Sequence, residues 1–285
     1  MNIKIVHTGL FKLDGGAMFG VVPKSMWKKL NPPDENNMCT WAMRCLLIET
    51  GDRKILVDTG LGDKQDEKFR SHFEPHGSQN LITSLEELDL VPEDITDVFL
   101  THLHFDHVGG AIKRGVGDEL VPTFPNAVYW SNEKHYQWAI HPNERERASF
   151  LKENFVPLSN LDCLQYIPVQ ETPYEWLPGI IVHYLYGHTE AMMALEIEVG
   201  TKTFFYCADL IPSSFHIGLP YVMSYDIRPL ISLQEKRTLL EKVVGKNWIL
   251  LFEHDPETEC ATLIRNEKGR ITLDKRLSLE EALEG

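Results

Sequence analysis

The chain has 285 residues, of which 43% are hydrophobic, and no Pro/Gly/Ser-rich linker interrupts it, so we expect residues 1–285 to form one domain with a large core. The net charge is -14 and no basic cluster stands out, so the surface would repel a phosphate backbone, which argues against a nucleic-acid partner. The apolar runs are too short to cross a bilayer, and we expect no membrane partner.

The N-terminus and the cysteines indicate the compartment. Residues 1–16, MNIKIVHTGLFKLDGG, alternate like a strand and lack the apolar stretch and cleavage site of a signal peptide. The five cysteines are odd in number and scattered, without a CxxC motif, which argues against both a disulfide framework and a thiolate zinc site. We therefore predict a protein of the reducing cytoplasm.

The hydrophobic pattern predicts strands in both halves of the chain, with helices between them. A first strand is expected over Asn2–Phe11, followed by a hairpin over residues 43–60 that turns at Gly51 and Asp52. Helices are expected over Ser78–Leu88, Asn132–Ile140 and Asn143–Phe155, and a capping box of Ser232 and Glu235 predicts a last helix that ends at Gly245. Further strands are expected at Ile95–Leu100, Ala127–Trp130, Ile180–Tyr186, Met193–Val199, Thr203–Ala208 and Trp248–Phe252, with a hairpin over residues 261–274. This order predicts an α/β protein with two packed sheets that carry helices on their outer faces.

The stretch FLTHLHFDHVGGA, Phe99 to Ala111, places four ligand-type side chains within six positions: His102, His104, Asp106 and His107. They follow a predicted strand, on irregular backbone where side chains separated by two positions can converge. Imidazole and carboxylate together suit zinc, iron or manganese, whereas clustered imidazoles make poor core residues. The motif predicts a metal site.

Four ligands so close in sequence cannot all serve one tetrahedral ion, so further ligands are needed elsewhere. Three residues follow predicted strands and can supply them: His188 in GHTE, Asp209 in CAD and His254 in EHD. Asp58 in VDTG also follows a strand, and is a candidate carboxylate for orienting a metal-bound histidine. Together these residues make a set for two metal ions.

Through VDTG, THLHFDHVGG, GHTE, CAD and EHD, the sequence resembles the metallo-β-lactamase superfamily. The resemblance implies a four-layer αββα sandwich with two divalent ions at one edge, most often zinc, with iron or manganese as alternatives. It implies that His102, His104 and His188 hold the first ion, that Asp106, His107 and His254 hold the second, and that Asp209 bridges them.

Within the superfamily, lactam-cleaving enzymes usually place cysteine or serine where this chain has Asp209, and flavodiiron oxidoreductases carry glutamate where it has His104. Neither branch is therefore favoured. The chain is most similar to the N-acyl-homoserine lactonase (quorum-quenching) group, through the segments DGGAMFGVVPK and YVMSYDIRPL. Organophosphate hydrolases share much of this plan and are the nearest alternative. A metal-binding protein without hydrolytic activity is a third.

The sequence departs from the superfamily pattern at two positions. Glu190 stands where proline is common, and Pro212 stands where well-known lactonases carry a catalytic tyrosine. Tyr225 is a candidate for the missing hydroxyl. In the long interval after the ligand motif, the aromatic and histidine side chains are candidates for a substrate pocket, but we expect most of them to pack onto the sandwich: Trp130, His135, Tyr136, Trp138 and His141. We expect NERERASFLKEN to be a solvated helix face.

The expected chemistry is hydrolysis of a lactone or an ester. Two divalent ions about 3.5–4 Å apart lower the pKa of a shared water, which can then attack a carbonyl as hydroxide without a serine or cysteine nucleophile. The ions also stabilise the resulting oxyanion, while Asp106 is expected to orient the hydroxide and pass a proton to the leaving group. The glycine-rich loop of residues 14–24 could cover a pocket for an acyl chain or form a homodimer contact.

Overall fold

The computed structural model describes residues 1–284 and divides the chain into two compact units. Unit 1 contains Met1–Leu10 and Met43–Glu171, and unit 2 contains Phe11–Ala42 and the chain from Thr172 onward. None of the described helices is both long and apolar enough to span a bilayer. The prediction that the whole chain is one domain stays a prediction.

A six-stranded sheet has the order β1-β2-β3-β4-β7-β8. Its strands are β1 (Asn2–Asp14), β2 (Met38–Thr50), β3 (Arg53–Val57), β4 (Asp97–Phe99), β7 (Val128–Ser131) and β8 (Leu164–Tyr166). The β2–β3 hairpin turns at Gly51, whose φ of 56° lies in the left-handed region that favours glycine, as predicted. Strands β3, β4, β7 and β8 run parallel, so their carboxyl ends share one edge, where the loops after β3 and β4 begin.

The other elements of unit 1 are short. They are α3 (Glu67–Phe73), α4 (Leu81–Glu86), η1 (Pro92–Asp94), α5 (Phe105–Val108), η2 (Gly109–Ala111), β5 (Ile112–Arg114), η3 (Val116–Asp118), β6 (Leu120–Pro122), α6 (Glu133–Ile140), η4 (Lys152–Asn154) and α7 (Val156–Asn160). Leu85 of α4 and Ala139 of α6 belong to the same buried cluster as Leu56 and Val98 of the sheet. Burial of these apolar side chains fixes the strands whose ends carry the ligand motif.

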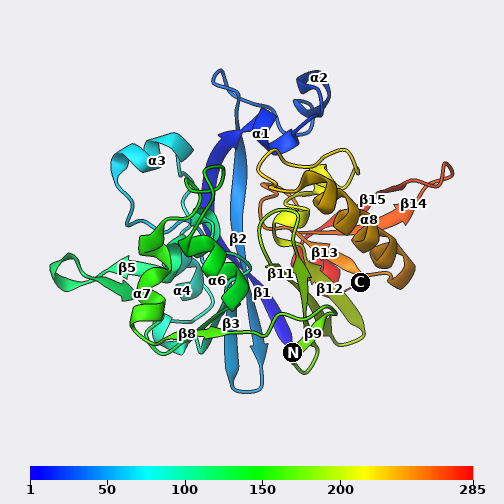
Figure 1. The fold of residues 1–285 in the computed structure, drawn as a ribbon. Coiled ribbons are helices and arrows are strands. Elements are labelled where there is room, and N and C mark those ends of the chain that lie inside the picture. Colours follow the sequence, from blue (N-terminus) through cyan, green and yellow to red (C-terminus); the bar gives the residue numbers. More distant parts are fainter. Residues whose placement is uncertain (285) are drawn as a thin grey trace. The chain divides into compact units, whose positions relative to one another are not determined.

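Unit 2 contains a seven-stranded sheet of order β15-β14-β13-β12-β11-β10-β9, in which Figure 1 shows β11, β12 and β13 side by side. Its strands are β9 (Tyr174–Leu177), β10 (Ile180–Leu185), β11 (Met192–Val199), β12 (Lys202–Tyr206), β13 (Ile249–Leu251), β14 (Cys260–Arg265) and β15 (Ile271–Leu277). Its helices are α1 (Gly15–Phe19), α2 (Lys24–Trp27), η5 (Ala208–Leu210), η6 (Ser214–His216), α8 (Pro229–Lys246) and α9 (Leu279–Glu284). Helix α8 connects the parallel pair β12 and β13, and its Leu240 and Val243 pack in one cluster with Phe205 and Leu250.

The predicted α/β class is confirmed, and both large sheets are mixed. Three helix predictions need correction. The helix expected over Ser78–Leu88 is only α4, Leu81–Glu86, and begins after the Asn80 cap. No α-helix covers Asn143–Phe155, where turns are followed by the 3-10 helix η4. The apolar Phe150 and Phe155 are five positions apart, so they do not share one face of a helix.

The predicted limits of the last helix are also wrong. Helix α8 begins at Pro229, so Ser232 lies inside it and does not cap it. The carboxylate of Glu235 accepts hydrogen bonds from the backbone N–H groups of Tyr186 and Gly187 instead, at 2.7 and 3.1 Å. The helix continues past Gly245 to Lys246, and it is capped by Asn247, which has a left-handed φ of 55°.

Candidate metal centre

In unit 1, the four residues of the ligand motif lie in the turn between β4 and α5 and at the start of α5. All four are buried: His102, His104, Asp106 and His107. The ring centroid of His102 lies 4.5 Å from that of His104 and 3.9 Å from that of His107. The structure therefore brings together the side chains that the sequence placed within six positions.

Asp58 organises this cluster from the loop after β3. Its carboxylate accepts hydrogen bonds from the backbone N–H of Thr101 at 2.8 Å and from the Thr101 hydroxyl at 2.6 Å, and it lies 3.2 Å from Nδ1 of His107. Since the Thr101 hydroxyl gives its single proton to Asp58, it accepts from Nδ1 of His102, 3.0 Å away. Both imidazoles then keep the lone pair on Nε2, the atom that a metal would bind.

Two side chains that the sequence analysis left out of the site support this loop. Nε2 of His135 accepts a hydrogen bond from the backbone N–H of Leu103, between the first two histidines of the motif. Oε1 of buried Glu146 lies 3.8 Å from Nε2 of His104, and its Oε2 accepts from Trp138 and Asn143. The segment NERERASFLKEN is therefore not a solvated helix face. The spacing of Asn143 and Glu146, typical of a capped turn, was the available signal.

Lys64 contacts the backbone at the end of the ligand loop. Its side chain is buried, and Nζ donates a hydrogen bond to the carbonyl of Gly109. Burial lowers the pKa of Lys64 to about 8.

In unit 2, three ligand-type residues from separate segments converge: His188 after β10, Asp209 in η5 and His254 after β13. Nε2 of His188 lies 3.1 Å from Oδ2 of Asp209, and Nε2 of His254 lies 3.0 Å from Oδ1. Each carboxylate oxygen thus faces one imidazole nitrogen. Ala208, just before Asp209, has a φ of 44°, a strained conformation for a residue with a Cβ and one that concentrates at functional sites.

Each histidine of this cluster has its own partner on Nδ1. His188 donates to Oδ1 of Asp226 at 2.8 Å, and His254 donates to the carbonyl of Ala42 at 2.7 Å. Nε2 again carries the lone pair. Asp226 was missed from the sequence, because nothing there links it to a histidine 38 positions earlier.

The donor sets fit divalent metal ions. Two ligand atoms bound to one tetrahedral ion at 2.0–2.1 Å lie roughly 3.3 Å apart, close to the separations that Asp209 makes with its two histidines. In proteins, zinc is commonly held by imidazole Nε2 atoms together with a buried carboxylate. A carboxylate or carbonyl that accepts from Nδ1 orients each imidazole, as it does here.

The residues that depart from the expected pattern have structural partners in unit 2. Glu190 pairs with Arg228 at 2.7 Å, and the carbonyl of Pro212 accepts from the backbone N–H of His254 at 2.9 Å. Tyr225 lies just before Asp226, and 37% of its surface is exposed.

Two further side chains shape the segments around His188 and Asp226. Glu235 holds the backbone before His188, and burial raises the pKa of its carboxyl. Nζ of Lys236 donates to the carbonyls of Gly218 and Tyr221, and burial lowers the pKa of this ammonium to about 7.

Comparison with known proteins gives the family. The model of the metallo-beta-lactamase superfamily matches residues 44–254, a span that contains every ligand-type residue described above. The chain belongs to the metallo-β-lactamase superfamily. Its buried histidine and aspartate clusters are those of a metal-dependent hydrolase of this superfamily.

Several relatives match most of the length of this chain. An N-acyl homoserine lactonase of Bacillus thuringiensis is 27% identical over 243 residues, which cover 81% of this chain and 86% of the relative. The crystal structure of a probable metal-dependent hydrolase from Staphylococcus aureus is 28% identical, with a TM-score of 0.84 over 97% of this chain and 98% of that chain. AidC, a dizinc quorum-quenching lactonase, is 20% identical, with a TM-score of 0.77 over 97% and 94% of the two chains. The metallo-β-lactamase fold expected from the motifs is confirmed.

Proposed function

We propose that this chain is a dinuclear metallohydrolase that opens N-acyl-homoserine lactones. Superfamily membership supports the metal-dependent hydrolysis, and the lactonase activity of relatives at 27% identity supports the substrate class. The alternative reaction on the same scaffold is hydrolysis of phosphotriesters, and it serves as the competing outcome of the test below.

The proposed ligand set follows the superfamily motif. One ion would be held by His102, His104 and His188, the other by Asp106, His107 and His254, and Asp209 would contribute to both. The observation that carries this proposal is the geometry of Asp209, whose two oxygens lie 3.1 and 3.0 Å from the Nε2 atoms of His188 and His254. In the proposed set those histidines would hold different ions, so one carboxylate would face a ligand of each. We propose zinc, as in the dizinc relative, with iron and manganese as alternatives.

When bound, the two ions supply a Lewis acid for the lactone carbonyl and lower the pKa of the attacking water. The protein's own residues then orient the reactants and move the proton. Asp106 accepts the proton of the attacking water on a carboxylate oxygen and returns it to the alcohol oxygen that leaves the ring. Tyr225 offers a hydroxyl as a hydrogen-bond donor to the substrate carbonyl, in the role that Pro212 cannot fill. Asp58 and Asp226 keep the imidazoles in the tautomer that presents Nε2.

An aromatic cluster beside the unit 1 ligands supports an acyl-chain substrate. Phe105, between His104 and Asp106, lies 5.4 Å from Phe69 and 4.4 Å from Phe73 of α3, between ring centroids. No residue of α3 is buried, so Phe69 and Phe73 keep exposed ring surface next to the ligand loop. A flexible apolar chain could bury this surface, which a small polar ester could not.

The test is a substrate panel run on metal-loaded protein. It contains homoserine lactones with C4, C8 and C12 acyl chains, an aryl ester and a phosphotriester, with ring opening followed through the released proton by a pH indicator. We expect kcat/KM of about 10⁴ M⁻¹s⁻¹ or more for the best lactone. Phe69→Ala should reduce kcat/KM for the C12 lactone much more than for the C4 lactone. Phosphotriester turnover a hundredfold faster than that of every lactone would replace the lactonase proposal.

The reducing cytoplasm remains our proposed compartment. All five cysteines are free, and four of them are buried. This cysteine usage supports a protein that does not depend on disulfides.

A further inference from the structure

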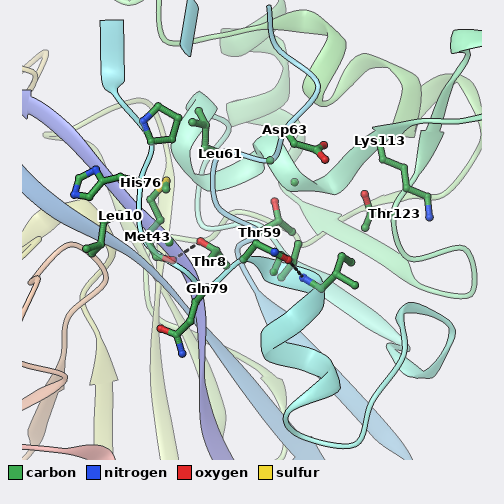
Figure 2. Close-up of a pocket in the computed structure, with 18 of the residues that line it drawn as sticks. Thr8, Leu10, Met43, Thr59, Leu61, Asp63, His76, Gln79, Lys113 and Thr123 are labelled. Atoms are coloured by element: carbon green, nitrogen blue, oxygen red, sulfur yellow. Dashed lines mark hydrogen bonds between the residues drawn. The ribbon is translucent and has the colours of Figure 1, made fainter. Parts of the chain in front are cut away.

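Unit 1 contains a cavity of about 520 Å³, a size typical of small-molecule sites (Figure 2). Four stretches of chain supply most of its lining: the end of β1 within unit 1, the loop after β3, residues 75–82, and residues between Gly110 and Thr123. Met43, Arg70 and Pro92 complete it. Of the residues proposed as metal ligands, none lines this cavity. It is therefore a separate feature of unit 1.

The walls of the cavity are tied to the fold by backbone contacts. Leu10 and His76 exchange two backbone hydrogen bonds, at 2.9 and 2.8 Å, which fasten the loop of residues 75–82 to β1. On the opposite wall, Gly110 donates to the carbonyl of Gly60 at 3.0 Å, and a Cβ on Gly110 would come within 2.3 Å of the Thr59 carbonyl oxygen. These contacts keep the cavity open without a ligand, so binding carries little entropic cost for ordering the loops.

A buried hydroxyl in the wall lacks a partner. Thr123 is 4% exposed, and its Oγ1 forms no hydrogen bond with any residue from 1 to 284. A buried hydroxyl without a partner is unfavourable, and in folded proteins such groups are usually satisfied by water or a ligand. Figure 2 shows Thr123 among the residues that surround the cavity. A ligand oxygen that accepts from Thr123 would remove this cost.

The charges and apolar groups of the wall restrict the chemical class of ligand that the cavity favours. Two permanent cations, Arg70 and Lys113, line the cavity together with a single carboxylate, that of Asp63. Nη1 of Arg70 donates to the carbonyl of Gly62 at 3.0 Å, which fixes its guanidinium at the wall. The apolar part of the lining consists of Leu10, Met43, Leu61, Pro75, Leu81, Ile82, Pro92 and Ile112. An excess of cation beside apolar side chains, in a protein of net charge -14, favours an anion that also carries hydrocarbon.

We propose that this cavity binds a small carboxylate with a short aliphatic chain. The carboxylate accepts from the Thr123 hydroxyl and pairs with Lys113, and the chain lies against Met43 and its apolar neighbours. The proposal does not depend on the lactonase activity, because no metal ligand takes part.

The test uses octanoate as the probe and the metal-loaded protein labelled with ¹³C at the methionine methyl groups. Met43 is the only one of the eight methionines that lines the cavity, so its methyl resonance reports occupancy there and not at the metal ligands. We expect a saturable shift of the Met43 resonance, with a Kd that rises at least fivefold in Thr123→Val and in Lys113→Ala. Lys268→Ala, an exposed lysine outside unit 1, is the matched control and should leave the Kd within twofold.

Octylammonium, with the same chain and the opposite charge, should bind at least tenfold more weakly than octanoate. The proposal is overturned if the Met43 resonance does not move, if octylammonium binds as tightly as octanoate, or if the Kd changes less than fivefold in Lys113→Ala. Lys113 is exposed, so this variant should fold even where Thr123→Val does not.

Discussion

The ligand cluster of unit 1 and that of unit 2 are held in different ways. In unit 1, four ligand-type residues come from one turn, and one carboxylate, Asp58, holds Thr101 and His107 directly and reaches His102 through the Thr101 hydroxyl. In unit 2, the ligands come from three separate segments. His188 relies on Asp226, while His254 relies on the carbonyl of Ala42.

This difference predicts how many ligands a single substitution should disturb in each cluster. Loss of Asp58 removes the support of two imidazoles and leaves the buried N–H and hydroxyl of Thr101 without their acceptor. Loss of Asp226 removes the hydrogen-bond acceptor of one imidazole, that of His188. Asp209 is the exception in unit 2, since each of its two carboxylate oxygens faces a different histidine.

The largest expected effect is therefore that of Asp209→Ala, compared with His104→Ala in unit 1. Metal analysis should find close to two ions per chain in the wild type, fewer than one in Asp209→Ala and at least one in His104→Ala. Loss of a residue that only supports a metal ligand lowers activity by up to roughly 100-fold. Turnover should fall by well over that factor in both variants, because each loses a ligand itself. His72→Ala, an exposed histidine of α3, should retain full activity. Two ions bound to Asp209→Ala would contradict the bridging role.

The next effect compares the two supporting carboxylates through Asp58→Asn and Asp226→Asn. Each should lower metal affinity by roughly 10- to 100-fold, measured against a chromogenic chelator, with the greater loss for Asp58 because it supports two imidazoles. Asparagine tolerates the φ of 59° at position 58, so the substitution tests the charge and not the backbone.

Asp89→Asn is the matched control, since Asp89 has the same φ of 59° and is exposed. It should bind metal like the wild type. A greater loss of metal affinity in Asp226→Asn than in Asp58→Asn would contradict the inference that Asp58 supports two imidazoles.

The same contrast explains which parts of the molecule could be predicted from the sequence. The unit 1 motif is local, so His102, His104, Asp106 and His107 could be recognised from spacing alone. The residues that hold it are distant in sequence: His135 reaches Leu103 and Glu146 reaches His104 only because the fold brings them there. Alternating and continuous apolar runs predicted most strands for the same reason, because burial on a sheet leaves a local pattern.

Elements controlled by side-chain hydrogen bonds were not predictable in this way. The segment 143–155 has the composition of a helix, but Glu146 is buried against Trp138 and Asn143, and the chain forms turns. Glu235 matched a capping box in sequence, yet its carboxylate holds the backbone ahead of His188. In both cases a tertiary contact outweighed a local preference.

A smaller effect is expected from Tyr225→Phe in unit 2. If its hydroxyl donates to the substrate carbonyl, kcat should fall by about tenfold or more while metal content stays at two ions per chain. Tyr166→Phe in unit 1 is the matched control, because Tyr166 is 38% exposed and Tyr225 is 37% exposed. Steady-state kinetics with the best lactone would decide this, and equal kcat values for both variants would remove Tyr225 from the mechanism.

The smallest effect concerns acid stability, and it places a pH-sensitive group in unit 2. His216 is fully buried, with Nε2 donating to the carbonyl of Met18 at 2.9 Å and Nδ1 accepting from the Ser213 hydroxyl at 2.7 Å. Burial lowers the pKa of His216 from 6.5 to about 3. Between these values the unfolded chain binds a proton that the folded chain does not, so stability is complete above pH 6.5 and is lost as the pH falls toward 3.

Thermal unfolding at pH 7.5 and pH 5 measures this contribution, which by linkage amounts to about 2 kcal/mol at pH 5. His216→Gln can keep both hydrogen bonds and has no proton to bind, so its Tm should fall less between the two pH values than that of the wild type, by a few degrees. Release of metal in acid affects both proteins and cancels in the comparison. His72→Gln should follow the wild type, because His72 is exposed. An equal acid-induced fall in Tm for wild type and His216→Gln would mean that the acid sensitivity of the fold comes from groups other than His216.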